Sequence, residues 1–233
     1  MIKTALIVGT GSGISAAFAR ALAADGYRVA LAARNVDKLA ALAGEIGALT
    51  VAVDATDPES VARLLAEVDR AFGRLDVVLY NASYRPTRGP FVDLDPQQMA
   101  RAIEVTAFGA FLVAQQAARR MLAQGGGAIF FTGASASVKG YAQSAPFALG
   151  KFALRGLAQS IARELQPKGI HVAHFVIDGG VRSVERERVE GAADAPDSLL
   201  DPGAIAETYM AVLKQPRSAW SLEVELRPWV ERF

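Results

Sequence analysis

The stretch Ala5-Leu-Ile-Val-Gly9-Thr-Gly-Ser-Gly-Ile-Ser15 decides the fold of this 233-residue chain. It begins as an apolar run too short for a helix, continues through three alternate glycines, and leads into Ala16–Leu22, whose apolar period suits a helix. Glycines let a ligand approach the main chain, and the first N–H groups of a helix attract phosphate. The order strand, turn and helix therefore indicates a nucleotide-binding turn, with a plain strand-to-helix turn as the alternative.

Composition excludes several classes of protein. Hydrophobic residues make up 52% of the chain and charged residues 21%, which is ordinary for a soluble globular domain. A net charge of +1 points to neither nucleic acid nor an anionic membrane as a partner, and the lack of cysteine excludes disulfides and thiolate chemistry. No apolar run approaches the ~18 residues of a membrane span, and the N-terminal run is too short for a signal peptide, so we expect a cytoplasmic protein.

Strand and helix patterns alternate along the rest of the chain. This alternation predicts one α/β domain over 1–233, a doubly wound parallel sheet of about seven strands with helices on both faces. Ligands bind such sheets beyond the carboxyl ends of the strands. The expected strands are 5–8, 27–33, 49–53, 76–80, 128–131, 169–176 and an edge strand at 222–226, and the expected helices are 16–22, 36–45, 57–72, 95–122, 146–165 and one that begins at Asp201.

The residues that follow the strands indicate which nucleotide binds. An acidic residue about 20 positions past the glycines usually holds the adenosine ribose, whereas this chain has Arg34 at that place. Because a guanidinium matches a phosphate, NADP(H) is favoured over NAD(H), with a surface arginine at a helix start as the alternative. Asp54 closes the third strand, where it could meet the adenine, and Asn81-Ala82-Ser83 follows the fourth; either could merely cap a turn.

These motifs together resemble the short-chain dehydrogenase/reductase family over essentially the full chain. The spacing Gly9-x3-Gly13-x-Ser15 is similar to the family's TGxxxGxG, with Val8 and Ser15 in place of the threonine and the last glycine. Asp54, Asn81-Ala82-Ser83 and Asp178-Gly179 stand at the family's other cofactor positions. The resemblance implies a Rossmann-type dinucleotide-binding domain whose cofactor contacts are Gly9, Gly11, Ser12, Gly13, Ile14, Arg34, Asp54, Asn81, Ala82, Lys151, Asp178 and Gly179.

The catalytic positions depart from the family pattern. The resemblance implies a YxxxK pair in which the ammonium lowers the pKa of a phenol that supplies the proton, with a serine and an asparagine nearby. The corresponding pentapeptide here is Phe147-Ala-Leu-Gly-Lys151, and ungapped counting puts the serine position at Ala134 and the asparagine position at Thr106. Loss of a general acid typically costs ~10²–10⁴ in rate, so the usual mechanism does not transfer unchanged.

Replacement groups exist near these positions. Lys151 is still expected to bind the nicotinamide ribose, and Ser135 supplies the missing hydroxyl if the loop shifts by one residue. Tyr141 in the same loop and Tyr84 after the fourth strand are candidate acids, although loop tyrosines are more often packed for their area.

Other chemistry-bearing residues have less specific interpretations. His171 and His174 lie on opposite faces of a strand, which indicates structural histidines and no metal site. The segment 178–200 is expected to be a substrate lid, and its Arg182, Arg186 and Arg188 either recognise an anionic substrate or belong to a solvated charged helix. The resemblance also implies a homo-oligomer, a dimer or a tetramer, formed through the helices that start near Asp95 and Pro146.

Three functions remain open. The leading hypothesis is an NADP(H)-dependent oxidoreductase with a non-standard proton relay that acts on a small carbonyl or alcohol substrate. The second is a catalytically silent dinucleotide-binding partner or redox sensor, which the missing tyrosine favours. The third is a non-redox enzyme, such as a dehydratase, in the same cleft. Lys151, Asp54 and the glycine turn favour every hypothesis in which the cofactor still binds.

Overall fold

The computed structural model describes residues 2–86, 88–183, 185, 187–191 and 195–231. It contains one seven-stranded sheet in the order β3-β2-β1-β4-β5-β6-β7, and every pairing is parallel. The predicted doubly wound sheet is confirmed, with the last strand at an edge. The strands are β1 (Thr4–Val8), β2 (Arg28–Ala33), β3 (Leu49–Ala52), β4 (Val77–Tyr80), β5 (Gly127–Thr132), β6 (Ile170–Ile177) and β7 (Glu223–Leu226).

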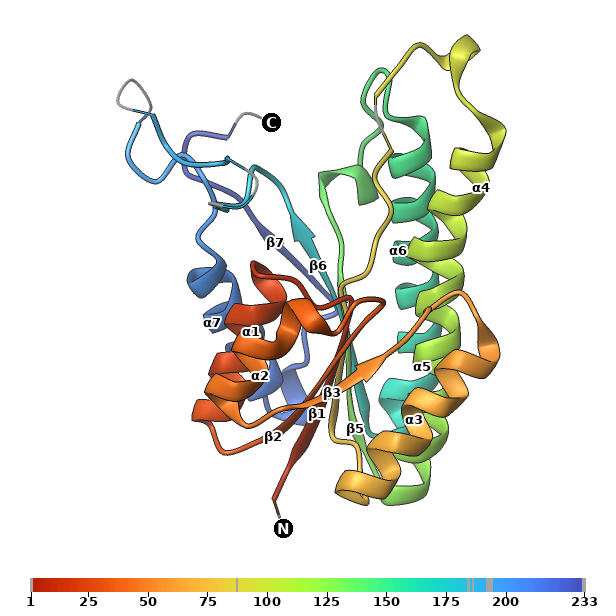
Figure 1. The fold of residues 1–233 in the computed structure, drawn as a ribbon, viewed down its shortest axis with the longest axis vertical. Coiled ribbons are helices and arrows are strands. Elements are labelled where there is room, and N and C mark those ends of the chain that lie inside the picture. The colour runs from red at the N-terminus through yellow and green to blue at the C-terminus, as the bar shows by residue number, and fades with distance from the viewer. Residues whose placement is uncertain (1, 87, 184, 186, 192–194, 232–233) are drawn as a thin grey trace.

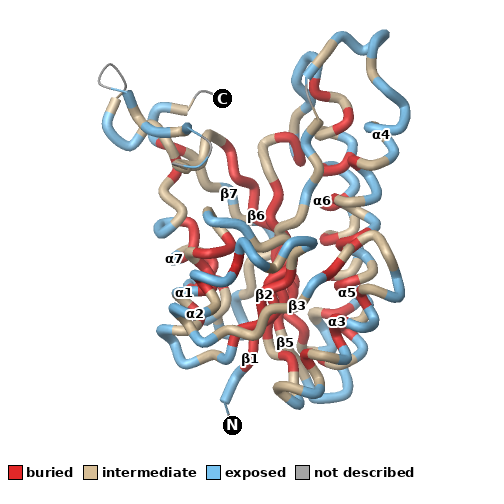
Figure 2. The backbone as a smooth tube through the Cα atoms, in the orientation of Figure 1, coloured by how far each residue is buried: buried red, intermediate tan, exposed pale blue. Residues whose placement is uncertain are grey.

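Helices cover both faces of the sheet (Figure 1). Side chains of β1 alternate between two apolar clusters, with Leu6 and Val8 in one and Ala5 and Ile7 in the other, as the two-residue period of a strand requires. Figure 2 shows this buried layer in the middle of the molecule. One face carries α1 (Ile14–Ala24), α2 (Ala40–Ile46) and α7 (Pro202–Leu213); the other carries α3 (Pro58–Phe72), α4 (Pro96–Ile103), α5 (Gly109–Gln124) and α6 (Ala145–Leu165).

Three helices begin with an aspartate followed by a proline. The side chains of Asp57, Asp95 and Asp201 each accept a hydrogen bond from the backbone N–H two residues further on, at 3.0, 2.9 and 2.7 Å. The proline occupies the first helical position, where its missing N–H costs nothing. The sequence signals for these helix starts are confirmed.

The helix expected over 95–122 is wrong in one respect, because α4 and α5 are joined by a π-helical turn at Glu104–Phe108. The Tyr80 hydroxyl donates a hydrogen bond to the Val105 carbonyl there. A side chain from the sheet thus bonds to a backbone carbonyl of the helix. Gly109 follows directly, and a Cβ at this position would lie 2.5 Å from the Tyr80 hydroxyl. The helix therefore changes pitch where it crosses Tyr80.

The expected helix 36–45 also starts differently, as a 3-10 turn over Asp37–Leu39 that leads into α2. The Asn35 side chain accepts a hydrogen bond from the Asp37 N–H at 3.0 Å and so caps this turn.

The glycine turn packs directly on the turn that follows β4. Gly9 has φ +83°, and a Cβ added to it would lie 2.3 Å from the Ala82 nitrogen. By contrast, no heavy atom lies within 4 Å of the corresponding position at Gly11 or Gly13. Gly9 is therefore required by the fold, whereas the other two glycines leave open space in front of α1.

We expect Gly9→Ala to destabilise the protein by about 1–3 kcal/mol or more, since the methyl group overlaps backbone atoms and the left-handed φ is unfavourable for alanine. Thermal unfolding measures this loss. Gly11→Ala is the matched control and should unfold close to wild type; equal losses in the two variants would contradict the packing argument.

Candidate functional site

One open cleft lies at the carboxyl ends of the strands, and it gathers residues from distant parts of the chain. Of the candidate cofactor and catalytic residues singled out from the sequence, Thr106 and Tyr84 do not line it. The predicted residues that do line the cleft are Gly9, Gly11, Ser12, Gly13, Ile14, Arg34, Asp54, Asn81, Ala82, Ala134, Ser135, Tyr141, Phe147, Lys151, Asp178 and Gly179.

The glycine turn forms the floor of the cleft and is held from behind by Asn81. The Asn81 amide donates hydrogen bonds to the Gly9 carbonyl at 3.2 Å and to the Ser15 hydroxyl at 2.8 Å. No side chain caps α1 at Gly13, so the first N–H groups of this helix remain available to a phosphate. Asn81 therefore shapes the turn with its amide group instead of presenting that group to a ligand.

Two cations stand beside the end of β2. Arg34 and Lys38 are exposed and line the cleft, and neither forms an ion pair with any of the described residues. Arg20 also reaches the cleft, but Glu45 pairs with it at 2.7 Å. Lys38 was not selected from the sequence, although its position about one helical turn after Arg34 could have indicated it. The pair offers two donors to one anion.

Asp54 lines the cleft after β3, the strand that pairs with β2. Its Oδ1 accepts hydrogen bonds from the N–H and the hydroxyl of Thr56 at 2.9 and 2.7 Å, and Arg101 lies 3.6 Å from Oδ2. These hydrogen bonds, together with the charge of Arg101, hold the pKa of the Asp54 carboxyl below its usual value. Asp54 is therefore an ionised acceptor at the rim of the cleft.

Lys151 is the buried charge of the site. Its side chain is 3% exposed, and its ammonium donates a hydrogen bond to the Thr132 carbonyl at 2.7 Å. Burial lowers the pKa of Lys151 to about 7. The Phe147 ring lies one helical turn earlier, with its centroid 5.9 Å from the ammonium nitrogen. An amine with a pKa near 7 thus stands beside an apolar ring, at the position where the resemblance implies a phenol.

Thr106, at the position where the resemblance implies an asparagine, is buried in the π-helical turn. Its hydroxyl accepts a hydrogen bond from the Tyr84 N–H at 3.4 Å, and it would lie 3.1 Å from a Cβ at Gly150. Thr106 therefore packs α6 against the π turn and does not face the cleft.

The loop after β5 lines the cleft with Ser135, Tyr141 and Ser144. Ser137 is fully buried and accepts a hydrogen bond from the Ala134 N–H at 3.1 Å, so it holds the loop in shape. Ser135 lines the cleft, as does Tyr141, which is 40% exposed. Ser137 therefore shapes the loop, whereas Ser135 lies on the wall of the cleft.

The start of the expected lid contains a buried carboxylate. Asp178 is 2% exposed, and Lys139 and Arg227 lie 3.4 and 3.7 Å from its Oδ2. Both cations come from other segments of the chain, and sequence reasoning missed them because no spacing links them to Asp178. The carboxylate is compensated within the protein.

The lid arginines have different surroundings. Arg182 pairs with Asp201 at 3.0 Å and with Glu190 at 3.5 Å, which occupies it with acids of the protein, while Arg188 lines the cleft. Arg186 lies outside the described residues. The expected lid segment also touches the glycine turn, where the Ser12 hydroxyl donates a hydrogen bond to Glu185 at 2.6 Å.

The two histidines pack within the protein. His171 stacks on Trp220 at 4.7 Å and shares a hydrogen bond with the Ser221 carbonyl at 2.9 Å, and His174 is fully buried against Gly133. Within the described ranges, no group of three His, Asp or Glu side chains could hold a metal ion, and no helix is long and apolar enough to cross a membrane.

The low pKa of Lys151 has a consequence for stability. Below about pH 7 the folded protein carries the full cost of a buried ammonium, and this cost declines as pH rises toward 10.5, the ordinary value. We expect Lys151→Met to gain stability relative to wild type by an amount that is constant below about pH 7 and shrinks above it. Chemical denaturation across this pH range measures the difference; a difference independent of pH would contradict the burial argument.

Comparisons with known proteins identify the family of this chain. Residues 3–189 match the family model described as short chain dehydrogenase. Sorbitol dehydrogenase of Cereibacter sphaeroides is 36% identical over 183 residues, which cover 76% of this chain and 71% of that protein.

Solved structures are similar over the whole chain. A short-chain dehydrogenase from Rhodopseudomonas palustris has a TM-score of 0.82 at 37% identity, covering 97% of this chain and 99% of that one. An alcohol dehydrogenase from the archaeon Thermococcus sibiricus, complexed with 5-hydroxy-NADP, has a TM-score of 0.85 at 28% identity, covering 100% and 99%. Since the family model spans most of the chain and the relatives share its fold, this chain belongs to the short-chain dehydrogenase/reductase family of oxidoreductases.

Proposed function

We propose that the protein is an NADP(H)-dependent oxidoreductase that interconverts a carbonyl and an alcohol on a small molecule. The observation that carries the proposal is what one cleft of a family member brings together: an uncapped α1 N-terminus, the cations Arg34 and Lys38, which pair with no acid among the described residues, and the buried Lys151. The similar archaeal alcohol dehydrogenase, complexed with an NADP derivative, supports both the cofactor and the reaction class.

The residues present fit such a dinucleotide. The open space at Gly11 and Gly13 leaves room for a pyrophosphate at the start of α1. Arg34 and Lys38 would hold the 2′-phosphate of NADP(H). A site specific for NAD(H) would have an acidic residue in their place. Asp54 would accept from the adenine amino group, and Lys151 would contact the nicotinamide ribose. When bound, the reduced dinucleotide supplies a hydride to the carbonyl carbon.

Lys151 is also the best-placed acid. Its ammonium is buried in the cleft, and its pKa of about 7 suits a group that gives and takes a proton at neutral pH. In the reductive direction Lys151 donates the proton to the carbonyl oxygen, and in the oxidative direction its neutral amine accepts the proton from the alcohol. The Thr132 carbonyl holds the amine in place, and Ser135 donates a hydrogen bond to the substrate oxygen.

Two further parts of the proposal concern the surroundings of the site. The segment 178–200 serves as a substrate lid, and its contact with Ser12 supports this role. The chain forms a homo-oligomer through α4, the π turn, α5 and α6. The support is a row of exposed apolar side chains on these elements, Ile103, Phe108, Phe111, Leu149 and Phe152.

A second candidate function is a catalytically silent dinucleotide-binding protein. The specific observation that favours it is Phe147, whose ring cannot donate the proton that the family's phenol supplies. The two candidates share the cofactor site and differ only in turnover.

The cofactor assignment predicts a selective loss in Arg34→Gln. Removing one charge-assisted hydrogen bond to the 2′-phosphate should weaken NADPH binding by about tenfold or more and leave NADH binding unchanged. Titration followed by nicotinamide fluorescence measures both affinities, with Arg119→Gln on the exposed face of α5 as the control. If wild type binds neither nucleotide, the proposed function fails; if Arg34→Gln weakens both equally, the phosphate assignment fails.

The relay predicts the pH dependence of turnover. Reduction needs protonated Lys151, so kcat/KM for reduction should fall as pH rises through about 7, and kcat/KM for oxidation should rise. Lys151→Ala should lose ~10²–10⁴ in rate. NADPH consumption across a panel of carbonyl compounds measures both effects, and Lys168→Ala on the surface is the control.

Lys151→Arg sharpens this test, since a guanidinium does not titrate near neutrality and the pH limb should disappear. If kcat/KM of Lys151→Arg still changes with pH near 7, another group donates the proton to the substrate. NADPH binding without turnover on any compound would favour the silent protein.

A further inference from the structure

Lys151 is buried without an acidic partner. Its side chain is 3% exposed, and it forms no ion pair with any residue that the structure describes. Its nitrogen donates a hydrogen bond to the Thr132 carbonyl at 2.7 Å, and this acceptor is neutral. A lysine is almost never buried to this extent unless an acid compensates its charge. The surroundings therefore favour the uncharged form of the amine.

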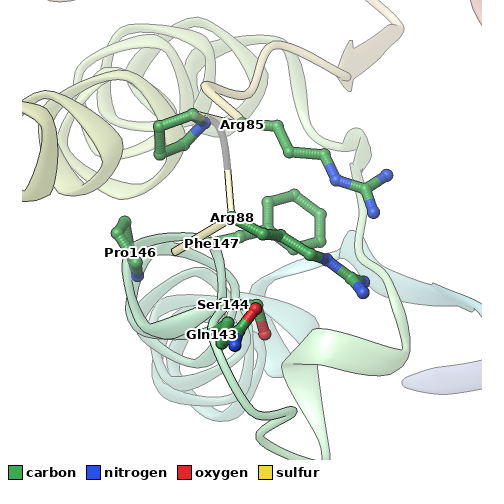
Figure 3. Close-up of a pocket in the computed structure, with 7 residues that line it drawn as sticks. Arg85, Arg88, Gln143, Ser144, Pro146 and Phe147 are labelled. Atoms are coloured by element: carbon green, nitrogen blue, oxygen red, sulfur yellow. The ribbon is translucent and has the colours of Figure 1, made fainter. Parts of the chain in front are cut away.

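The side of the amine that faces the start of α6 is apolar. The centroid of the Phe147 ring lies 5.9 Å from the Lys151 nitrogen. This ring belongs to a small group of residues between the loop after β4 and α6, and none of the described members of that group is acidic (Figure 3). Arg85 of the loop lies over the same ring, with its guanidinium carbon 5.0 Å from the centroid. No carboxylate therefore approaches Lys151 from these described residues.

Charged groups of the other neighbouring elements are occupied or neutral. Glu223 of β7 pairs with Arg155, one helical turn further along α6, at 2.6 Å. Asp178 after β6 lies 3.4 Å from Lys139 of the loop after β5. His174 of β6 is fully buried, and burial lowers its pKa to about 4, so its ring carries no charge near pH 7. None of these groups stabilises a positive charge on the buried amine.

The neutral amine has a lone pair that its contacts do not engage. Thr132 offers a carbonyl, which takes one N–H, and neither this carbonyl nor the Phe147 ring can donate to the nitrogen. Lys151 lines the large cleft, whose volume of about 1520 Å³ leaves room for a small organic molecule. Desolvation of this kind is what makes a lysine nucleophilic toward carbonyl compounds.

The fraction of neutral amine is large at neutral pH. With a pKa of about 7, about half of Lys151 is unprotonated at pH 7. A lysine with the ordinary value of 10.5 is unprotonated in only about one molecule in 10³ at this pH. Lys151 therefore differs from the surface lysines in the amount of nucleophile that it presents.

We propose that Lys151 is the site of a second, covalent activity, in which its amine captures an aldehyde in the cleft as an imine. The nitrogen lone pair attacks the carbonyl carbon and forms a C–N bond, and one proton passes from the nitrogen to the former carbonyl oxygen. The C–O bond of this carbinolamine then breaks, and the hydroxyl leaves as water with the second proton of the nitrogen. The product is a C=N bond. No oxidant or reductant is consumed, and hydrolysis reverses the step.

The inference goes beyond the proposed function, because the aldehyde binds covalently and no dinucleotide takes part. One consequence rests on the proposed function. An imine on Lys151 removes the amine that donates the proton, so an aldehyde that reaches the cleft before the cofactor blocks turnover until water hydrolyses the imine.

Reductive trapping tests the capture on the full chain without nucleotide. Benzaldehyde and sodium cyanoborohydride convert an imine into a stable benzylamine, and peptide mapping by mass spectrometry locates it. At pH 7 and limiting aldehyde, we expect Lys151 to be labelled at least about tenfold faster than the surface residue Lys168 in the same mixture. Mapping separates this label from label on the α-amino group. Labelling of Lys151 no faster than that of Lys168 would overturn the inference.

Variants separate the nucleophile from its surroundings. Lys151→Arg should lose the fast label and Lys168→Arg should keep it; a fast label that persists in Lys151→Arg would place the capture elsewhere and contradict the proposal. Phe147→Glu puts a carboxylate one helical turn before the amine, holds it protonated, and should slow labelling at pH 7 by about tenfold or more. Phe147→Leu keeps that side apolar and should label as wild type does. Equal rates in the two Phe147 variants would refute the burial argument.

Failure of this inference is distinguishable from failure of the proposed function. Trapping needs no nucleotide, and fluorescence titration with NADPH needs no aldehyde. If NADPH binds and carbonyl compounds are reduced while Lys151 stays unlabelled, only the covalent capture is wrong. If NADPH does not bind while Lys151 is labelled, the proposed function fails and the capture stands.

Discussion

The close approach of Gly9 to Ala82 is the constraint on which the rest of the structure depends. Only a residue without a side chain lets the turn after β1 lie against the turn after β4, at 2.3 Å from where a Cβ would stand. This contact fixes Asn81 behind the glycine turn and leaves the start of α1 open toward the cleft. β1 pairs with both β2 and β4, so the strand order reverses beside β1. The turn after β1 therefore lies at the point where sheets of this kind bind ligands.

Much of this arrangement could be predicted from local signals. Apolar runs bounded by glycine indicated the strands, and Asp-Pro pairs indicated three helix starts, because both signals act over a few residues. Arg34 and Asp54 could be placed at the cleft since they directly follow strands whose carboxyl ends must meet.

What could not be predicted depends on contacts between distant segments. The π turn at Glu104–Phe108 arises where Tyr80 of the sheet bonds to Val105 of the helix, and no pattern within the helix encodes that partner. Asp178 likewise finds Lys139 and Arg227 only after folding. The grouping of Arg85 with Phe147 depends on how the loop after β4 folds against the start of α6, and loops lack the periodicity on which sequence patterns rest.

The hydrogen bond between Ser12 and Glu185 links the segment that we propose as a lid to the glycine turn. A hydroxyl has one proton to donate, so a ligand oxygen that accepts this proton must displace the Glu185 carboxylate. A negatively charged ligand at the glycine turn would also repel that carboxylate. Binding of an anion at the glycine turn and the Ser12–Glu185 hydrogen bond therefore oppose each other. Because linked equilibria are reciprocal, the hydrogen bond to Glu185 weakens the binding of the anion by the same factor by which the anion weakens that bond.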